Sequence, residues 1–403
     1  MRRTGLTVLM WLVVASCVAG VVRGQQGQQP PQAQALFRRL DRNGDGVLTS
    51  DEVERPGLFR RMDTDGNGRV TSQEARASLR LEEGARRPQP AVPPTHADVP
   101  YGPHERNVLD LYLAKSDEPT PLLVFIHGGG FVGGDKRNVQ PPLIRDMHRH
   151  GVSVASLNYR FVTTDPMPAC FHDAARAVQF LRLNAPKYNL DPKRFAASGG
   201  SAGAGISLWL AFHDDLVDPV AEDPLLRQST RLSCAAVSGA QVSYDPRFWR
   251  QIGLARGLDH PSFGRMYGRR EGEPPESPRL VALYEECASI THATADDPPV
   301  YMTYGVADEI GPDTPMNAII HHPRHGLVLR EKLEPLGVEC IVVYRGGPEP
   351  PMSQSEFLVR HLKAGAPPER SMPEVHQPHS ATSTRPPRMA SVAGSRTASP
   401  FSL

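Results

Sequence analysis

Short apolar runs separated by longer segments of mixed polarity dominate the chain between residues 99 and 363. Brief apolar runs bounded by turn residues are typical of buried strands, whereas a 3.6-residue apolar period indicates helices. The runs predict strands at Val108–Leu113, Leu122–Ile126, Val152–Leu157, Arg194–Ser198, Cys234–Ser238, Val300–Tyr304 and Glu339–Tyr344. The segments between them predict helices at Cys170–Asn184, Ala202–His213 and His325–Leu336. This alternation favours an α/β fold, with a mostly parallel sheet and helices on both faces.

The first residues follow a different pattern. Residues 1–24 begin with Arg2 and Arg3, continue through the apolar stretch Leu6–Val14 and end in small residues, as an export signal does. We therefore expect a protein that is secreted, periplasmic or on the cell surface. Neither this stretch nor any later one reaches the ~20 apolar residues of a membrane span. A lipid anchor on Cys17, within a sequence similar to a bacterial lipoprotein signal, is the alternative.

Three segments lack any apolar period. Residues 25–34 are rich in Gln and Pro, residues 83–98 in Pro and charged side chains, and residues 364–403 in Pro, Ser, Thr and Arg. Such compositions predict a disordered spacer, a linker and a disordered tail. They leave two candidate domains, at residues 35–82 and 99–363.

Residues 35–82 contain an internal repeat, because Leu36–Asp41 recurs as Leu58–Asp63. Each copy opens a loop with Asp or Asn at positions 1, 3 and 5, Gly at 6 and Glu at 12, which is the EF-hand pattern. Short oxygen-bearing side chains, a backbone carbonyl at position 7 and a bidentate Glu are the ligands that Ca²⁺ requires. The predicted ligands are Asp41, Asn43, Asp45, Val47, Thr49 and Glu52 in the first loop and Asp63, Asp65, Asn67, Arg69, Thr71 and Glu74 in the second.

We expect this small α-helical module to bind two calcium ions, with Leu48 and Val70 pairing the loops through a short strand. Calcium outside cells is abundant and constant, so a structural or docking role is favoured over a switch. The alternative is a pair of solvated acidic turns.

Charge and cysteine content narrow the function further. The formal net charge of +1 becomes −2 once the three arginines of residues 1–24 are removed, which gives no indication of nucleic-acid binding. Four cysteines remain, and an oxidising compartment would allow three pairings among them. Buried free thiols are favoured, because a domain of this size does not need cross-links. The four are Cys170, Cys234, Cys287 and Cys340.

Two glycine-rich turns follow predicted strands and carry the candidate chemistry. The turn Gly199–Gly203 places Ser201 between a strand and a helix, where glycines permit a sharp turn that exposes the hydroxyl. The turn His127–Phe131 contains three glycines, whose backbone amides can approach an oxyanion. Together they predict acyl transfer by a serine nucleophile without a catalytic cofactor.

With these motifs, residues 99–363 resemble the α/β-hydrolases, and within them the secreted carboxylesterases near the hormone-sensitive-lipase-like and feruloyl or acetyl-xylan esterases. The resemblance is also carried by Leu109–Tyr112, Gly133–Lys136, Asn158–Arg160 and Pro298–Asp308. It implies Ser201 as nucleophile, the amides of Gly129, Gly130 and Ala202 as oxyanion donors, and Asp308 as the acid that orients a histidine.

The catalytic histidine is where the sequence departs from the family. The family carries it after the last strand, but here no histidine follows Glu339–Tyr344 before His361. A long loop after Asp308 ends in the adjacent residues His321 and His322, and either could fold back to Ser201. We assign His322. The alternative is that the His-His-Pro turn only caps the next helix.

We therefore predict a secreted serine carboxylic-ester hydrolase that acts on small acyl esters or on acetyl or feruloyl esters of polysaccharides, with a calcium-binding module. The substrate class rests on the resemblance. A serine without a nearby base is a poor nucleophile, so the alternative is a hydrolase-fold protein that has lost turnover and serves as a calcium-stabilised binding module.

Overall fold

The computed structural model describes residues 92–364 and, before them, residues 37, 40–53, 59, 62, 63, 65–72, 74 and 75. It divides into two compact units between Pro90 and Ala91. The predicted signal (1–24) and spacer (25–34), and nearly all of the predicted tail (364–403), lie outside the described residues.

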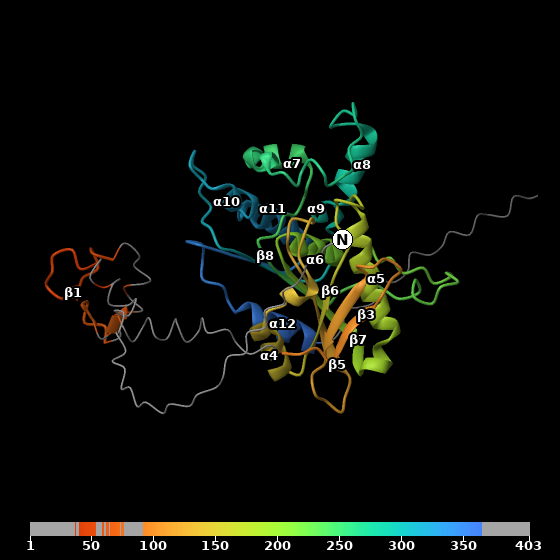
Figure 1. The fold of residues 1–403 in the computed structure, drawn as a ribbon, viewed down its shortest axis with the longest axis horizontal. Coiled ribbons are helices and arrows are strands. Elements are labelled where there is room, and N and C mark those ends of the chain that lie inside the picture. The colour runs from red at the N-terminus through yellow and green to blue at the C-terminus, as the bar shows by residue number, and fades with distance from the viewer. Residues whose placement is uncertain are drawn as a thin grey trace, which may run out of the picture. The chain divides into compact units, whose positions relative to one another are not determined.

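The N-terminal unit is built around two short strands, β1 (Val47–Leu48) and β2 (Val70–Thr71) (Figure 1). They pair antiparallel, with Leu48 opposite Val70, as the loop pattern predicted. Both side chains are fully buried because each loop alone would leave its apolar residue in water. The described core around them also contains Phe37, Val53, Phe59, Met62 and Ala75.

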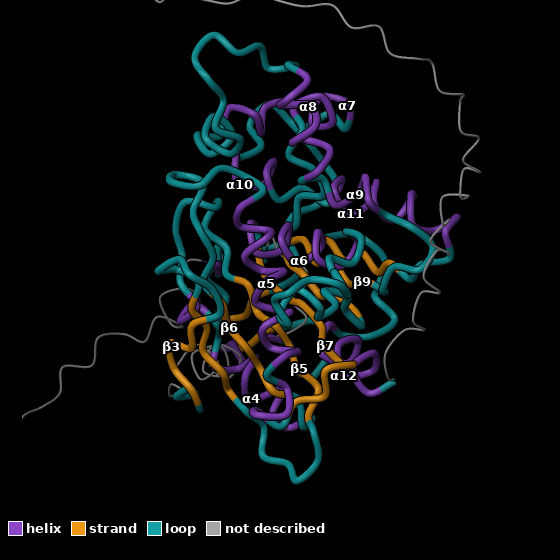
Figure 2. Tube along the Cα trace, turned by 90° about the vertical axis from the view of Figure 1, so that its right-hand side faces the viewer, coloured by secondary structure: helices purple, strands orange, loops and turns teal. Residues whose placement is uncertain are grey.

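The second unit contains an eight-stranded sheet in the order β10-β9-β8-β7-β5-β6-β4-β3. Figure 2 labels β3, β6, β5, β7 and β9 of this sheet. Strands β10 to β6 in this order run parallel, and β4 and β3 are antiparallel to their neighbours. The strands are β3 (His96–Pro100), β4 (Val108–Tyr112), β5 (Thr120–Ile126), β6 (Ser153–Leu157), β7 (Leu190–Gly200), β8 (Cys234–Ser238), β9 (Val300–Tyr304) and β10 (Cys340–Tyr344). All seven predicted strands are present, and the predicted fold class is confirmed.

The end of the predicted linker, residues 83–98, belongs to the sheet, because strand β3 begins at His96. Residues 83–91 of that linker lie outside the described residues. The amide of Thr95 donates to the carbonyl of Leu111, and β3 then pairs with β4 at the sheet edge. The charged and polar residues that suggested a linker are mostly exposed there, because an edge strand has only one neighbour to bury it.

Nine α-helices are described in this unit: α4 (Pro141–Arg149), α5 (Ala169–Leu183), α6 (Ala202–Phe212), α7 (Pro246–Gln251), α8 (Pro278–Glu286), α9 (Ser289–His292), α10 (Met316–Ile320), α11 (Arg324–Leu333) and α12 (Gln354–Lys363). Short 3₁₀ segments lie at Lys136–Asn138, Ala185–Tyr188, Ala255–Asp259 and Glu334–Leu336. The three predicted helices correspond to α5, α6 and α11, although the last ends at Leu333 because Pro335 cannot continue an α-helix.

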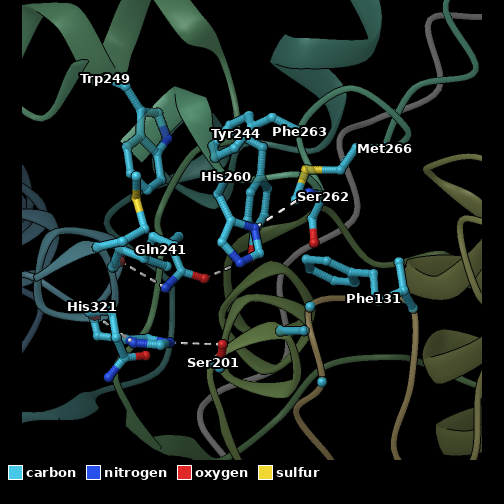
Figure 3. Close-up of a pocket in the computed structure, with 17 residues that line it drawn as sticks. Phe131, Ser201, Gln241, Tyr244, Trp249, His260, Ser262, Phe263, Met266 and His321 are labelled. Atoms are coloured by element: carbon cyan, nitrogen blue, oxygen red, sulfur yellow. Dashed lines mark hydrogen bonds between the residues drawn. The ribbon is translucent and has the colours of Figure 1, made fainter. Parts of the chain in front are cut away.

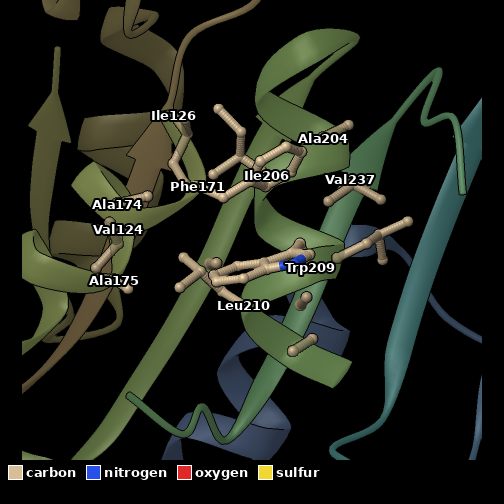
Figure 4. Close-up of a cluster of buried hydrophobic side chains, with 14 of the residues drawn as sticks. Val124, Ile126, Phe171, Ala174, Ala175, Ala204, Ile206, Trp209, Leu210 and Val237 are labelled. Atoms are coloured by element: carbon tan, nitrogen blue, oxygen red, sulfur yellow. The ribbon is translucent and has the colours of Figure 1, made fainter. Parts of the chain in front are cut away.

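Successive side chains of a strand point to opposite faces of the sheet, and each face forms its own hydrophobic core. On β5, Val124 and Ile126 face the core formed with α5 and α6, whereas Leu123 faces the core formed with α4 and α12. Figure 4 shows the first core, in which Trp209 of α6 packs among small and branched side chains. Helices thus cover both faces, and α6, which begins beside Ser201, is buried along its whole length.

Cys170, Cys234, Cys287 and Cys340 are all free thiols, and the first three are buried. Within the described ranges, no helix combines the length and the apolar character that crossing a bilayer demands.

Candidate active site

Ser201 lies on a strained turn between β7 and α6. Its backbone has φ 53° and ψ −118°, in a region that L-residues seldom occupy. A Cβ added at Gly203 would come 2.0 Å from the carbonyl oxygen of Ile126, and one at Gly199 would come 2.5 Å from the same oxygen. Only glycine therefore allows β7 and α6 to approach β5 this closely, and the resulting turn exposes the serine side chain at the end of the sheet.

The glycine loop after β5 lies against this turn. Gly129 and Gly130 have φ of 121° and 60°. A Cβ on Gly128 would lie 2.7 Å from the carbonyl oxygen of Gly200, so the loop and the serine turn are in close contact. Gly129, Gly130 and Ala202 line the same pocket as Ser201, with Ala202 at the first position of α6, where helix amides have no intrahelical acceptor.

His127 supports the glycine loop from below. Its ring is fully buried, stacks on Tyr159 at 4.4 Å between centroids, and has Nδ1 2.7 Å from the carbonyl oxygen of Gly128. Burial lowers the pKa of His127 to about 4, so the ring is neutral near pH 7. The Tyr159 hydroxyl also donates to the His127 carbonyl. These contacts hold the loop in shape.

The histidine beside the serine is His321. Its Nε2 lies 2.8 Å from Oγ of Ser201, and its Nδ1 lies 2.9 Å from the carbonyl oxygen of Asn317, one turn earlier in α10. Because a carbonyl oxygen only accepts, Nδ1 carries the proton and Nε2 presents its lone pair to the serine hydroxyl. Burial lowers the pKa of His321, which also favours the neutral ring.

This arrangement corrects the assignment of His322, which does not contact Ser201. The side chain of His322 is completely buried, and its Nδ1 lies 3.6 Å from Oδ1 of Asp308. Adjacent residues at the end of a helix point about 100° apart, so only one of the two can face the serine. Helix α10 ends at Ile320 and leaves His321 as its C-cap, turned toward the pocket.

Asp308 is consequently not placed against the histidine that contacts the serine. Its Oδ1 is also 3.5 Å from Nε of Arg324, so this carboxylate joins the start of α11 to the end of β9. Asp308 thus lies shortly after β9, as predicted, but it does not orient the histidine that contacts Ser201.

Two residues that the sequence analysis did not single out hold His321 in place. A Cβ on Gly239 (φ 60°) would lie 2.9 Å from Cδ2 of His321, so the imidazole lies directly over this glycine. The side-chain amide of Gln241 donates to the carbonyls of Gly239 and Ile320. The sequence signal was the Ser-Gly pair at the end of the predicted strand Cys234–Ser238, which parallels the glycines after β5 and β7.

The serine opens into a pocket of about 570 Å³ (Figure 3). Its walls combine large apolar side chains with a few polar groups. The apolar wall comprises Phe131, Tyr244, Trp249, Phe263, Met266 and Met316, and the polar groups include Gln241, His260, Ser262 and Asn317. Most of these residues belong to the segment between β8 and β9 and to α10.

The second EF-hand loop has the geometry of an oxygen-rich cation site. In the second loop, carboxylate oxygens of Asp63, Asp65 and Glu74 lie within 4.8 Å of one another. Oδ1 of Asp63 is buried and has no hydrogen-bond partner among the described residues, as expected of an oxygen that serves as a cation ligand. In the first loop, Glu52 is 4% exposed and its carboxylate accepts from the amides of Asn43 and Thr49.

A serine turn and an amide-lined glycine loop at the ends of a mostly parallel sheet define the α/β-hydrolase class. The BD-FAE family model matches residues 109–318, which is more than half of the 403-residue chain. The chain therefore belongs to the BD-FAE family of α/β-hydrolases. The EF-hand model matches residues 33–55 and 57–76, which confirms the predicted repeat.

Curated relatives include carboxylic ester hydrolases. The probable carboxylic ester hydrolase LipM of Mycobacterium tuberculosis is 27% identical over 221 residues, which cover 53% of this chain and 48% of LipM. Esterase LipQ of the same organism is 26% identical over 55% of this chain and 51% of LipQ. The chain thus spans about half the length of the curated relatives it matches.

Solved structures support the same fold. An acetyl ester-xyloside bifunctional hydrolase from Caldicellulosiruptor lactoaceticus superposes with a TM-score of 0.51 and 20% identity, over 68% of this chain and 98% of that protein. A truncated carbohydrate esterase from gut microbiota gives a TM-score of 0.50 and 18% identity, over 66% and 96% of the two chains. At this level of identity the similarity concerns the fold.

Proposed function

We propose that this protein is a serine carboxylic-ester hydrolase. The observation that carries the proposal is the 2.8 Å contact between Oγ of Ser201 and Nε2 of His321, beside the amides of the glycine loop. A hydroxyl bonded to the lone pair of a neutral imidazole is the activated nucleophile of acyl transfer. The family membership and the ester-hydrolase relatives support the same activity.

In this reaction Oγ of Ser201 attacks the ester carbonyl while its proton moves to Nε2 of His321. The amides of Gly129, Gly130 and Ala202 face the carbonyl oxygen as it becomes negative, where each donor contributes roughly 10²–10³ in rate. The imidazolium then returns the proton to the leaving alcohol, and water repeats the cycle on the acyl-serine. The carbonyl of Asn317 holds His321 in the productive tautomer throughout.

The pocket supports an ester whose acyl or alcohol part is moderately large and partly apolar. Four aromatic side chains line about 570 Å³, and His260 and Ser262 offer hydrogen bonds to an oxygen-rich group. An acetyl or feruloyl ester of a polysaccharide meets both conditions, and the solved acetyl ester-xyloside hydrolase has the same fold. Small acyl esters also fit.

A fluorophosphonate probe tests the nucleophile, because it reacts only with an activated serine. We expect labelling of the wild type at Ser201, no labelling of Ser201→Ala, and hydrolysis of p-nitrophenyl acetate by the wild type only. Ser262→Ala, which also lines the pocket, is the matched control and should still be labelled. A wild type that neither reacts with the probe nor hydrolyses the ester would favour a binding protein that has lost turnover.

We also propose that the EF-hand loops bind two calcium ions with a structural role. Asp63, Asp65 and Glu74 would supply carboxylate oxygens in the second loop, and Glu52 would close the first. Bringing like charges this close is costly without a cation, which supports the assignment. We expect export from residues 1–24. An exported module would be in constant contact with abundant calcium, which agrees with a structural role for the ions.

Calorimetry with CaCl₂ tests the metal sites directly. Two equivalents should bind the wild type, one equivalent should bind Glu74→Gln, and none should bind Glu52→Gln combined with Glu74→Gln. Asp51→Asn is the matched control, since Asp51 lies beside Glu52 but outside the ligand positions. Calcium binding that is unchanged in the double variant would contradict the assignment.

A further inference from the structure

A second cluster of metal-binding side chains lies at the opposite end of α6 from Ser201. His213 caps the C-terminus of α6, Glu286 ends α8, and His292 ends α9. Each offers one ligand atom, and the three atoms lie within 4.8 Å of one another. The helix rise of ~1.5 Å per residue over the eleven residues of α6 separates the cluster from the serine by about 16 Å. The cluster is therefore not part of the ester site.

We propose that His213, Glu286 and His292 form a binding site for a zinc-class divalent transition metal. Two imidazole nitrogens and one carboxylate oxygen are a ligand set that Zn²⁺ binds in many proteins. Nε2 of His213 lies 3.3 Å from Oε1 of Glu286. Ligands ~2.0–2.1 Å from a tetrahedral ion are separated by about 3.3 Å, so this pair already has the required spacing.

The hydrogen bonds around the cluster favour metal binding. Nδ1 of His213 lies 2.8 Å from the carbonyl oxygen of Asp214, and Nε2 of His292 lies 2.9 Å from that of Glu286. A neutral imidazole at each position donates from this nitrogen and keeps a lone pair on the other, which is Nε2 of His213 and Nδ1 of His292. Metal-binding histidines in proteins are oriented in this way by their outer hydrogen bonds.

The ligands are also held in position by packing. Trp209 of α6 donates from Nε1 to the carbonyl of Glu286, and the ring of His213 lies 4.2 Å from that of Trp209. The rings of His213 and His292 are 4.6 Å apart. All three ligand residues are only partly exposed, so an ion would be reached from solvent yet held by ordered side chains.

The site has a structural consequence, because the three ligands come from different elements. A bound ion would join the end of the helix that starts at the nucleophile to α8 and α9, which belong to the segment between β8 and β9. Three protein ligands leave the fourth tetrahedral position for water. The proposal does not depend on the ester hydrolase activity, and its test uses metal binding as the readout.

Zinc titration of the untagged full chain tests the site in buffer with saturating CaCl₂, which occupies the oxygen ligands of the EF-hand loops. We expect one Zn²⁺ per chain, visible d–d bands of four-coordinate cobalt when Co²⁺ replaces it, and a Tm about 5 °C higher or more at a hundredfold excess over Kd. Glu286→Gln keeps the side-chain size and the backbone carbonyl, and it should weaken zinc binding by about 100-fold.

The His292→Gln variant should weaken binding similarly, whereas His150→Ala, at the exposed C-cap of α4, should leave it unchanged. The Tm of each variant without zinc verifies that it is folded. The proposal would be overturned if the wild type bound no zinc, or if folded Glu286→Gln and His292→Gln bound zinc with the wild-type affinity.

Discussion

The two sides of the active-site pocket are built in different ways. On the nucleophile side, comprising the serine turn Gly199–Gly203 and the glycine loop His127–Phe131, backbone segments are in contact and leave no room for a Cβ at Gly128, Gly129, Gly199 or Gly203. On the base side, comprising the segment from Asp308 to His325, the histidine is held by hydrogen bonds and packing that involve Gly239 and Gln241 from another part of the chain.

The difference shows on which side of the pocket a substitution can change the activity without destabilising the fold. A backbone contact at 2.0 Å, as for a Cβ at Gly203, cannot be relieved without moving β7 or α6, so a change there damages the fold along with the activity. The base side can be changed one side chain at a time, because each of its contacts has a side chain, that of His321 or Gln241, at one end. Activity and stability should therefore separate on the base side only.

Removing the imidazole should have the largest effect. His321→Ala deprives Ser201 of its proton acceptor, and we expect kcat/KM on p-nitrophenyl acetate to fall about 10⁴-fold or more, with Tm nearly unchanged. Gly203→Ala on the nucleophile side should instead lower Tm and activity together. Equal losses of Tm in the two variants would contradict the distinction between the two sides.

Displacing the imidazole should cost less than removing it. In Gly239→Ala the new Cβ would lie 2.9 Å from the ring of His321, and a shift of about 1 Å in a catalytic group can reduce kcat by roughly 10²-fold. Gly337→Ala is the matched control, because Gly337 has φ 72° but nothing within 4 Å of its added Cβ. Both variants should lose similar stability, and only Gly239→Ala should lose kcat.

Neutralising Asp308 should have a small effect on the reaction. Its carboxylate lies 3.6 Å from Nδ1 of His322, whereas Nδ1 of His321 is bonded to the carbonyl of Asn317. We expect Asp308→Asn to change kcat by less than about tenfold, compared with the ~10⁴-fold loss when the acid of a Ser-His-Asp triad is neutralised. A loss of kcat near 10⁴-fold at unchanged Tm would mean that Asp308 supports the catalytic histidine after all.

The nucleophile side could be read from the sequence because its constraints are local. Glycines flanking Ser201 and following Ile126 mark the turns directly, and the strands Cys234–Ser238 and Val300–Tyr304 were predicted residue for residue from short apolar runs. Tight turns require glycine and buried strands require apolar residues at the same positions, so both can be predicted from the local sequence.

The base side could be predicted only in part. The sequence indicated that the histidine lies after Asp308 and not after β10, and it offered His321 and His322. The choice between them depends on where α10 ends, and α10 has only five residues, too few to show a helical period. Its end is set by contacts with Gln241, about 80 positions earlier in the chain, and such a contact leaves no local pattern.

The smallest expected effect is a displacement of the pH profile. His321 acts as a base only when its ring is neutral, so kcat/KM falls as the pH drops through its pKa. Burial lowers that pKa, and the nearby His260 lowers it further, whereas the bond to the Asn317 carbonyl raises it. We therefore expect the acidic limb of kcat/KM to have its midpoint below 6.5, the usual value for histidine. His260→Gln should move the midpoint upward, because His260 is one of the groups that lower the pKa of His321. A midpoint above 6.5 in the wild type would instead indicate a carboxylate at Nδ1, which stabilises the imidazolium, and would thus argue that the base side is organised like an ordinary triad.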